Sequence, residues 1–246
     1  MTPPIEIERS KCDSFRTVLW NQVVHIGKNT EPNEKTLLLL ASILKLREQA
    51  RAALLLSESG FVEEILSTSR TMCEAAINAA YLQIAEDEEF ERFKHFDTQS
   101  LYKMSGKLKR LGTVLDAEAS AAMDSAVAHA RSQTAGRQDK DLSWSIRQLA
   151  QRAEVADHRI GTNIFESLMS TAYSWSHRAV HATFGAVSPF YEALQTGTIP
   201  LTGDRLHDLE MALNNVNFVL HTEAGYLEHT FHTGMGRDIL RITQSA

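Results

Sequence analysis

The chain contains few residues that cross-link a fold or interrupt helices. Its 246 residues include 2 cysteines, 12 glycines and 5 prolines. Cys12 and Cys73 are too few and too far apart for a disulfide framework or a zinc ribbon, so we expect both to be reduced. The scarcity of glycine and proline favours long helices. Aromatic residues make up only 7% of the chain, but apolar residues reach 43%, which is enough to form a core.

Long apolar runs and a secretory leader are also missing. The most apolar run, Leu37 to Leu46, is interrupted by Ser42 and Lys45, and it falls far short of the roughly 20 residues that span a bilayer. The first residues contain neither a basic leader nor an apolar segment. We therefore expect a cytoplasmic protein without a membrane segment. The net charge of −6 argues against a general nucleic-acid coat, although a local basic patch is compatible with it.

Motifs of the common enzyme classes are absent as well. The sequence has no Gly-x-Ser-x-Gly elbow, no glycine-rich phosphate loop and no dinucleotide fingerprint. These absences argue against conventional hydrolases, kinases and dehydrogenases, and no cofactor is expected. The sequence is compatible both with an enzyme and with a binding protein.

Apolar periodicity along the whole chain predicts an all-α fold, a single bundle of about seven to eight antiparallel helices. We expect residues 1–58 to form an N-terminal helical pair that packs on a main bundle, residues 59–246, in one continuous globule. Caps and apolar stripes predict helices over residues 10–26, 34–57, 61–85, 88–110, 116–131, 142–154, 160–184 and 203–232.

Details of these helices give further expectations. Asn33 is the expected N-cap of the second helix. The apolar stripe of that helix is Leu37, Leu40, Ala41, Leu44 and Leu55. Residues 132–140 are expected to form a surface loop, and the tail after Gly234 is expected to be weakly held.

The helix expected over residues 160–184 carries two different ribbons. Its apolar side consists of Phe165, Leu168, Met169, Ala172, Ala179, Val180 and Thr183. Its polar side consists of Asn163, Glu166, Ser170, Ser174, His177 and His181. Small hydroxyls that lead to a histidine pair are typical of a polar groove, which either packs against another helix or holds a ligand.

A second polar strip lies on the helix expected over residues 61–85. It contains Glu63, Arg70, Glu74 and Tyr81. If this helix packs antiparallel to the one that carries His177, the two strips meet and combine a cation for an anionic group with an imidazole for proton transfer. The alternative is an ordinary Arg70–Glu74 pair at i, i+4 beside a hydrogen-bonded histidine.

Two histidine groups have spacings that metal sites also use. His177 and His181 lie one helical turn apart, and His221, Glu228, His229 and His232 lie along roughly one side of the last long helix. No glutamate follows the zinc-protease pattern, and no Glu-x-x-His pair of the di-iron type occurs. Most histidines at such spacings face solvent or a neighbouring helix, so no metal site is assigned.

Four segments resemble a known family: Arg70–Leu82, Phe93–Phe96, Trp144–Arg147 and Tyr173–His181. Together they resemble domain of unknown function 5677, an uncharacterised bacterial helical family, over about Gly60 to Leu194. The resemblance implies an intracellular all-helical domain without an established activity. More distantly, the arrangement is similar to the HEPN superfamily of helical ribonucleases and nucleotide-binding domains, which occur in toxin and phage-defence systems.

The HEPN resemblance implies catalytic roles for particular residues. Such enzymes cut RNA without a metal, with an arginine and a histidine close in sequence, usually across a homodimer. Applied here, the resemblance makes His181 the general acid/base beside His177, Arg178 or Arg70 the phosphate clamp, and Glu74 the residue that orients them. Two residues separate Arg178 from His181. Five residues separate Arg152 from His158, which is the more usual spacing.

Two functional hypotheses follow. In the first, the chain is an interaction, regulatory or ligand-binding domain that forms a homodimer, and the groove at His177 and His181 is a structural or ligand-binding seam. In the second, it is a HEPN-like, metal-independent ribonuclease or toxin that takes RNA or a nucleotide.

Overall fold

The computed structural model describes residues 3–31, 33–110, 116–133, 144–145, 147–176, 191, 195 and 206–245. Every regular element in these ranges is a helix, which confirms the expected all-α fold class. Within the same ranges, no helix combines the length and the apolar character needed to cross a membrane. The chain divides into two compact units, one made of Met1–Gln83 and Leu149–Ala246 and the other of Ile84–Gln148.

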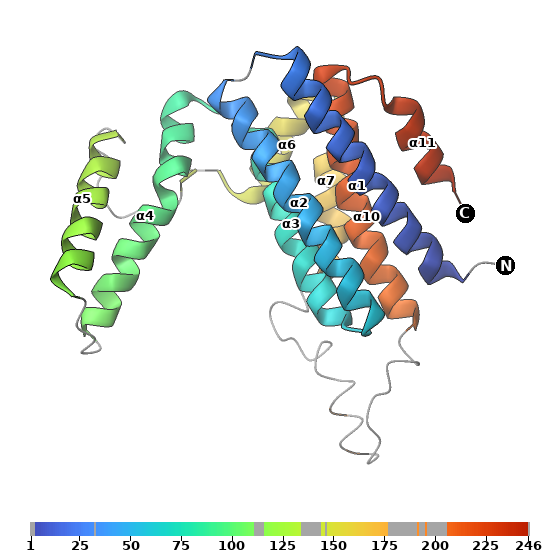
Figure 1. The fold of residues 1–246 in the computed structure, drawn as a ribbon, viewed down its shortest axis with the longest axis horizontal. Helices are drawn as coiled ribbons and strands as arrows, with labels where there is room; N and C mark the ends of the chain where they lie inside the picture. Colours follow the sequence, from blue (N-terminus) through green and yellow to red (C-terminus); the bar gives the residue numbers. More distant parts are fainter. Residues whose placement is uncertain are drawn as a thin grey trace. The chain divides into compact units, whose positions relative to one another are not determined.

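Four long helices frame the first unit (Figure 1). They are α1 (Pro4–Asn29), α2 (Glu34–Glu58), α3 (Val62–Leu82) and α10 (Leu206–Phe231). α10 packs against α1 and α3, and α2 packs against both α1 and α3. Each helix contributes fully buried apolar side chains to one core, for example Leu19, Ile43, Ile77 and Val216.

The start of α2 agrees with the sequence-based expectation, but its buried face does not. The Asn33 side chain accepts the Thr36 amide at 2.8 Å and caps the helix. Leu37, Leu44 and Leu55, which were expected to be buried, are 52%, 37% and 57% exposed. Leu40 of the expected stripe is buried, and the core takes it together with Leu39, Ile43, Leu46, Ala50 and Ala53. Leucine and alanine lie on all sides of this helix, so apolar spacing alone does not define one inward face.

Residues 149–173 form three short helical segments: α6 (Leu149–Ile160), α7 (Ile164–Leu168) and a π-helical turn, η1 (Met169–Tyr173). The helix expected over 142–154 was therefore wrong at both bounds, and the one expected over 160–184 was wrong at its start, while its end lies outside the described residues. Among residues 144–148, those that the structure describes are not helical. Gly161 directly follows the end of α6, and its φ of +67° is a conformation that favours glycine.

The C-terminal segment is held more firmly than its sequence predicted. It forms α11 (Gly236–Gln244), which contacts α1 and buries Ile239. The turn before α11 is tied to α10 because Glu228 accepts the Met235 amide at 3.0 Å and the Thr233 hydroxyl. Gln22 of α1 donates to the same Thr233 hydroxyl at 3.1 Å. The expectation of a weakly held tail was wrong, since these contacts fix the turn.

The second unit contains α4 (Asp87–Arg110) and α5 (Ala117–Gln133), which pack against each other. Their bounds lie close to the expected ones. Phe93 of α4 meets Trp144 edge to face, with 4.9 Å between the ring centres. Arg92 donates to the Trp144 carbonyl at 3.1 Å, which fixes the same contact. Most of the loop expected over 132–140 lies outside the described residues.

Candidate functional site

Arg70 lies on α3 at the edge where this helix contacts η1. Its Nη2 donates to the Tyr173 hydroxyl at 2.8 Å, and its guanidinium carbon lies 4.4 Å from the centre of the Tyr173 ring. Its Nε lies 3.4 Å from Oε1 of Glu74, one turn along α3. The Arg70 side chain is 13% exposed and that of Glu74 is 43% exposed. The cation is therefore held mostly under the surface, with the carboxylate at its outer side.

Tyr173 links the two charged groups. Burial raises the pKa of its phenol, the Glu74 charge and a hydrogen bond with Glu74 raise it further, and Arg70 acts in the opposite direction. The phenol is therefore protonated at neutral pH, so Tyr173 can accept from Arg70 and donate to Glu74 at once.

A π-helical turn positions Tyr173. The Ser174 hydroxyl donates to the Met169 carbonyl, five residues earlier, at 2.8 Å. π turns are rare inside α-helices, and those that do occur often lie at functional sites. Because the wider turn rotates the residues that follow it, the even spacing assumed for the ribbons of residues 163–183 does not hold across Met169–Tyr173.

A buried pair of hydroxyls continues the contact between α3 and this segment. Ser69 and Ser176 lie 2.7 Å apart, oxygen to oxygen, and both are fully buried. Ser69 also lies 2.9 Å from the Leu66 carbonyl, and Ser176 lies 2.6 Å from the Ala172 carbonyl. The polar contact between the two segments therefore extends inward from Arg70 into the core.

Asp157, near the end of α6, fixes the start of the segment that leads to Tyr173. Its Oδ2 accepts the Glu166 amide at 2.8 Å, and its Oδ1 accepts the Phe165 amide at 3.1 Å and the Thr162 hydroxyl at 3.0 Å. These are amides of the first turn of α7, which otherwise lack helical partners. Asn163, the residue directly before α7, makes no side-chain cap. The carboxylate of Asp157 takes that role from the previous helix.

The candidate catalytic residues divide into two groups. Arg70 and Glu74 are brought together as described above. His177, Arg178 and His181 lie outside the described residues. The strip expected on α3 is less uniform than its spacing suggested, since Tyr81 is 2% exposed and belongs to the core.

The histidines of α10 have separate surroundings. His221 packs against Phe15, with 5.7 Å between ring centres, and burial lowers the pKa of its imidazole. The Glu228 carboxylate accepts a hydrogen bond from the Met235 amide in the turn before α11, while His229 is exposed. Among the described residues, no group of three or more His, Cys, Asp or Glu side chains is arranged to hold a metal ion.

The alternative pair Arg152 and His158 lies on α6. Six positions apart on one helix, the two side chains point about 120° away from each other. Arg152 is half-buried and His158 is exposed. The two residues therefore do not share a face of α6.

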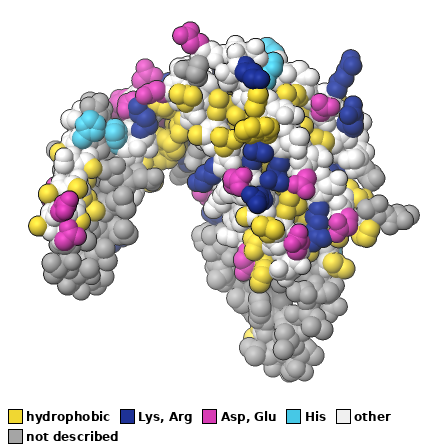
Figure 2. All heavy atoms as spheres, viewed as in Figure 1, with side chains coloured by type: hydrophobic (Ala, Val, Ile, Leu, Met, Phe, Trp, Pro, Cys, Tyr) yellow, Lys and Arg dark blue, Asp and Glu magenta, His cyan; other side chains and the backbone are white. Residues whose placement is uncertain are grey.

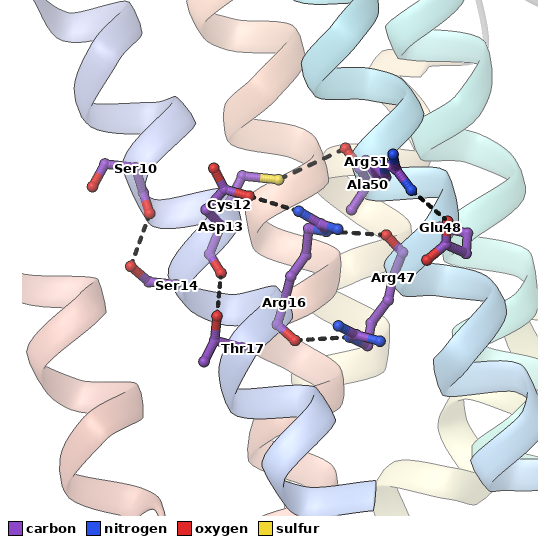
Figure 3. A network of polar contacts seen from close by, with 10 residues as sticks. All are labelled: Ser10, Cys12, Asp13, Ser14, Arg16, Thr17, Arg47, Glu48, Ala50 and Arg51. Carbon is purple, nitrogen blue, oxygen red and sulfur yellow. Dashed lines mark hydrogen bonds and ion pairs between the residues drawn. The ribbon is translucent and has the colours of Figure 1, made fainter.

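The seam between α1 and α2 contains a further polar network (Figure 3). Arg16 donates to the Arg47 carbonyl at 3.2 Å, and Arg47 donates to the Arg16 carbonyl at 2.8 Å. Asp13 accepts Arg16 at 2.6 Å, and Arg47 also lies over the Trp20 ring, 5.1 Å from its centre. Burial, followed by the charge of Arg16, lowers the pKa of Arg47. These guanidinium groups join the two helices and hold their relative register.

The sequence also matches a family model. The model describes DUF5677, a family of unknown function, and it matches residues 36–196, more than half of the chain. The chain belongs to the DUF5677 family. No curated protein and no solved structure was found to match it.

The DUF5677 segment contains every described residue of the Arg70 site. It begins in α2 and includes α3, α6, α7 and η1, so Arg70, Glu74, Asp157 and Tyr173 all lie within it. α1, α10 and α11 lie outside it and complete the core of the first unit.

Sequence reasoning missed two residues that build this site. In the sequence, Tyr173 stands out only as part of the segment Tyr173–His181 that resembles the family. Its contact with Arg70 spans 103 positions of the chain, so no local pattern reveals it. Asp157 gave no capping signal, since it precedes the amides it accepts by eight and nine residues, whereas an ordinary N-cap precedes them by two or three.

Proposed function

We propose that this DUF5677 protein is a binding and interaction module that works as a homodimer and holds a phosphate-bearing ligand, a nucleotide or an RNA segment, at the edge between α3 and η1. The supporting observation is the Arg70 guanidinium, restrained by both the ring and the hydroxyl of Tyr173. A guanidinium held in one orientation can bind phosphate through two parallel hydrogen bonds.

Glu74 controls access to this cation. Its contact with Arg70 is long, at 3.4 Å, and its side chain is the more exposed of the pair. A long ion pair whose carboxylate is exposed contributes little to stability. An incoming phosphate can therefore replace the carboxylate beside Arg70, and the displaced Glu74 side chain can turn into water. Anion binding and the Arg70–Glu74 pair compete.

Calorimetric titration of the full chain with nucleotides and short RNA oligomers tests this function. Arg70→Gln is expected to weaken a wild-type binder about tenfold or more, because a charge-assisted hydrogen bond is lost. Glu74→Gln removes the competing charge and is expected to tighten binding. The matched control is Arg241→Gln, which removes an exposed arginine paired with Asp238 on α11 at 3.6 Å and is expected to change nothing. No binder below millimolar concentration, or equal affinity in all three variants, would refute the proposal.

The second candidate function is a HEPN-like, metal-independent ribonuclease. The observation that favours it is that Tyr173, the partner of Arg70, precedes His177 by only four residues in the sequence. In this reaction His181 acts as general acid/base, with His177 beside it. Arg70 or Arg178 clamps the phosphate and Glu74 orients the groups.

RNA cleavage in the presence of a metal chelator tests the second candidate. His181→Ala is expected to lower the cleavage rate about 100-fold or more, the range of general acid/base catalysis. His207→Ala serves as control, since His207 is an exposed histidine on α10. Cleavage that survives His181→Ala at the wild-type rate rejects this function, as does an absence of cleavage in the wild-type protein.

A further inference from the structure

α2 carries an exposed apolar stripe. Leu37, Leu44 and Leu55 belong to a series with Ala41, Glu48 and Arg51 that repeats at alternating intervals of four and three residues. This is the spacing of the seam in a coiled coil. On the face formed by α1 and α2, Figure 2 shows a group of charged side chains with hydrophobic side chains around it. An exposed stripe with this period is suited to packing against a second helix.

We propose that this stripe is the surface through which two copies of the chain pair, with α2 antiparallel to α2 about a two-fold axis. The inference rests on the homodimer of the proposed function and assigns a surface to it. It does not depend on the phosphate-bearing ligand, because Arg70 is on α3 and is not part of the stripe.

The charges of the stripe select one register. In a two-fold pair, positions at equal distances from the axis face each other. One register sets Glu48 of each copy opposite Arg51 of the other, and the same register sets Leu44 opposite Leu55. A register centred on Leu46 would instead oppose Leu44 to Glu48, and one centred on Glu48 would bring two glutamates together. Only the first register pairs opposite charges and leucines at the same time.

Glu48 and Arg51 can form ion pairs between the two copies in place of the pair within each chain. They lie 3.8 Å apart within one chain, and both are exposed, so this intrachain ion pair contributes little to stability. Across the axis each finds an opposite charge on the second copy, flanked by the facing leucines. In coiled coils, a polar residue at a seam position specifies the register of the pair at some cost in stability.

The surroundings of the stripe also suit a second copy. α2 is fixed against α1 by the reciprocal hydrogen bonds of Arg16 and Arg47 (Figure 3), so the surface does not need to order on binding. Beside it, Trp20 on α1 is exposed. Phe61, just beyond the C-terminal end of α2, is also exposed, and the antiparallel register brings it towards Leu37 of the other copy.

Sedimentation of the full chain, with and without charge reversal, tests this surface. The wild-type protein is expected to sediment at twice its chain mass of 27.5 kDa. Glu48→Arg and Arg51→Glu each place like charges across the axis, and each is expected to raise the dimer dissociation constant about tenfold or more. Mixing the two variants is expected to restore the dimer, since every facing pair is then opposite in charge. Restoration on mixing shows that both variants are folded.

Leucine variants give an independent measurement. Leu55→Lys is expected to abolish the dimer, whereas Leu240→Lys, at an equally exposed leucine of α11, leaves it intact. A dimer that ignores Leu55→Lys and both charge variants refutes the α2 surface but leaves the homodimer standing. A monomeric wild type refutes both. Neither result affects ligand binding at Arg70, which the calorimetric titration measures separately.

Discussion

The hydroxyl oxygens of Ser69 and Ser176 lie 2.7 Å apart inside the bundle and join α3 to the segment that follows η1. Each hydroxyl is also within hydrogen-bonding distance of a main-chain carbonyl of its own helix. Two hydroxyl hydrogens therefore serve three contacts, and only one serine at a time can donate to the other. The pair forms the buried end of the edge at which Arg70 meets Tyr173.

Ser69→Ala and Ser176→Ala are expected to lower the free energy of unfolding by about 1 kcal/mol each. The double variant is expected to lose less than the sum, because the first substitution already removes the shared hydrogen bond. Urea denaturation of the four proteins measures this coupling. Strictly additive losses would show that the two hydroxyls do not interact in solution.

Asp157→Ala is expected to destabilise the protein by about 1–3 kcal/mol, because it leaves the buried Phe165 amide and the Glu166 amide without an acceptor. Asp157→Asn keeps one acceptor oxygen and is expected to lose less. Asn33→Ala, at the exposed cap of α2, is the comparison and is expected to cost about 1 kcal/mol. Denaturant titration gives all three values. A smaller loss for Asp157→Ala than for Asn33→Ala would contradict the assigned role of Asp157.

Glu223 predicts a dependence of stability on pH. Its side chain is fully buried on α10, neither carboxylate oxygen has a hydrogen-bond partner among the described residues, and burial raises its pKa from 4.5 to about 8. Between these values the folded protein keeps a proton that the unfolded chain releases. The free energy of unfolding therefore falls as the pH rises from about 4.5 to about 8, by an amount on the order of a few kcal/mol, and then levels off.

Glu223→Gln is expected to remove this slope, because an amide does not titrate. Urea denaturation at several pH values between about 5 and 9 measures the effect. Glu210→Gln, on the partly exposed side of the same helix, is expected to keep the wild-type slope. Parallel pH profiles for wild type and Glu223→Gln would show that Glu223 does not hold a proton in the folded state.

Glu228→Gln is expected to loosen α11. Although burial acts in the opposite direction, hydrogen bonds from Thr233, Met235 and Gly234, together with nearby His232, lower the pKa of Glu228. The ionised Glu228 carboxylate therefore stabilises the folded protein. This contribution is present above the pKa that Glu228 has in the unfolded chain, and it is lost as the pH falls through the lower pKa of Glu228 in the folded protein. Hydrogen exchange of Gly236–Gln244 is expected to speed up in the variant at neutral pH, and in the wild type on acidification.

Glu210→Gln, a change on the partly exposed side of α10 and outside the turn before α11, is the control and is expected to leave exchange unchanged. Equal exchange of α11 in Glu228→Gln and wild type would mean that the apolar contact of Ile239 alone holds this helix.

Local sequence signals predicted those parts of the fold whose causes are local. The Asn33 cap, the extents of α4 and α5 and the long α10 follow from capping residues and apolar spacing within a few turns. The π turn at Met169–Tyr173 has no such signal, because the same residues are compatible with an ordinary α-helix. In the candidate site, Arg70 and Glu74 were predicted together because one helical turn separates them, whereas Asp157 was not.

The all-helical fold of this chain follows from its sequence, because the helical period of the apolar residues is a property of each segment taken separately. Which side of α2 is buried depends on packing, since apolar residues lie all round that helix and its inward face is set by the way α1, α3 and α10 pack against it. The contact between Arg70 and Tyr173 also depends on packing. The two residues lie 103 positions apart in the sequence, so they meet only when the helices between them have folded and brought them together.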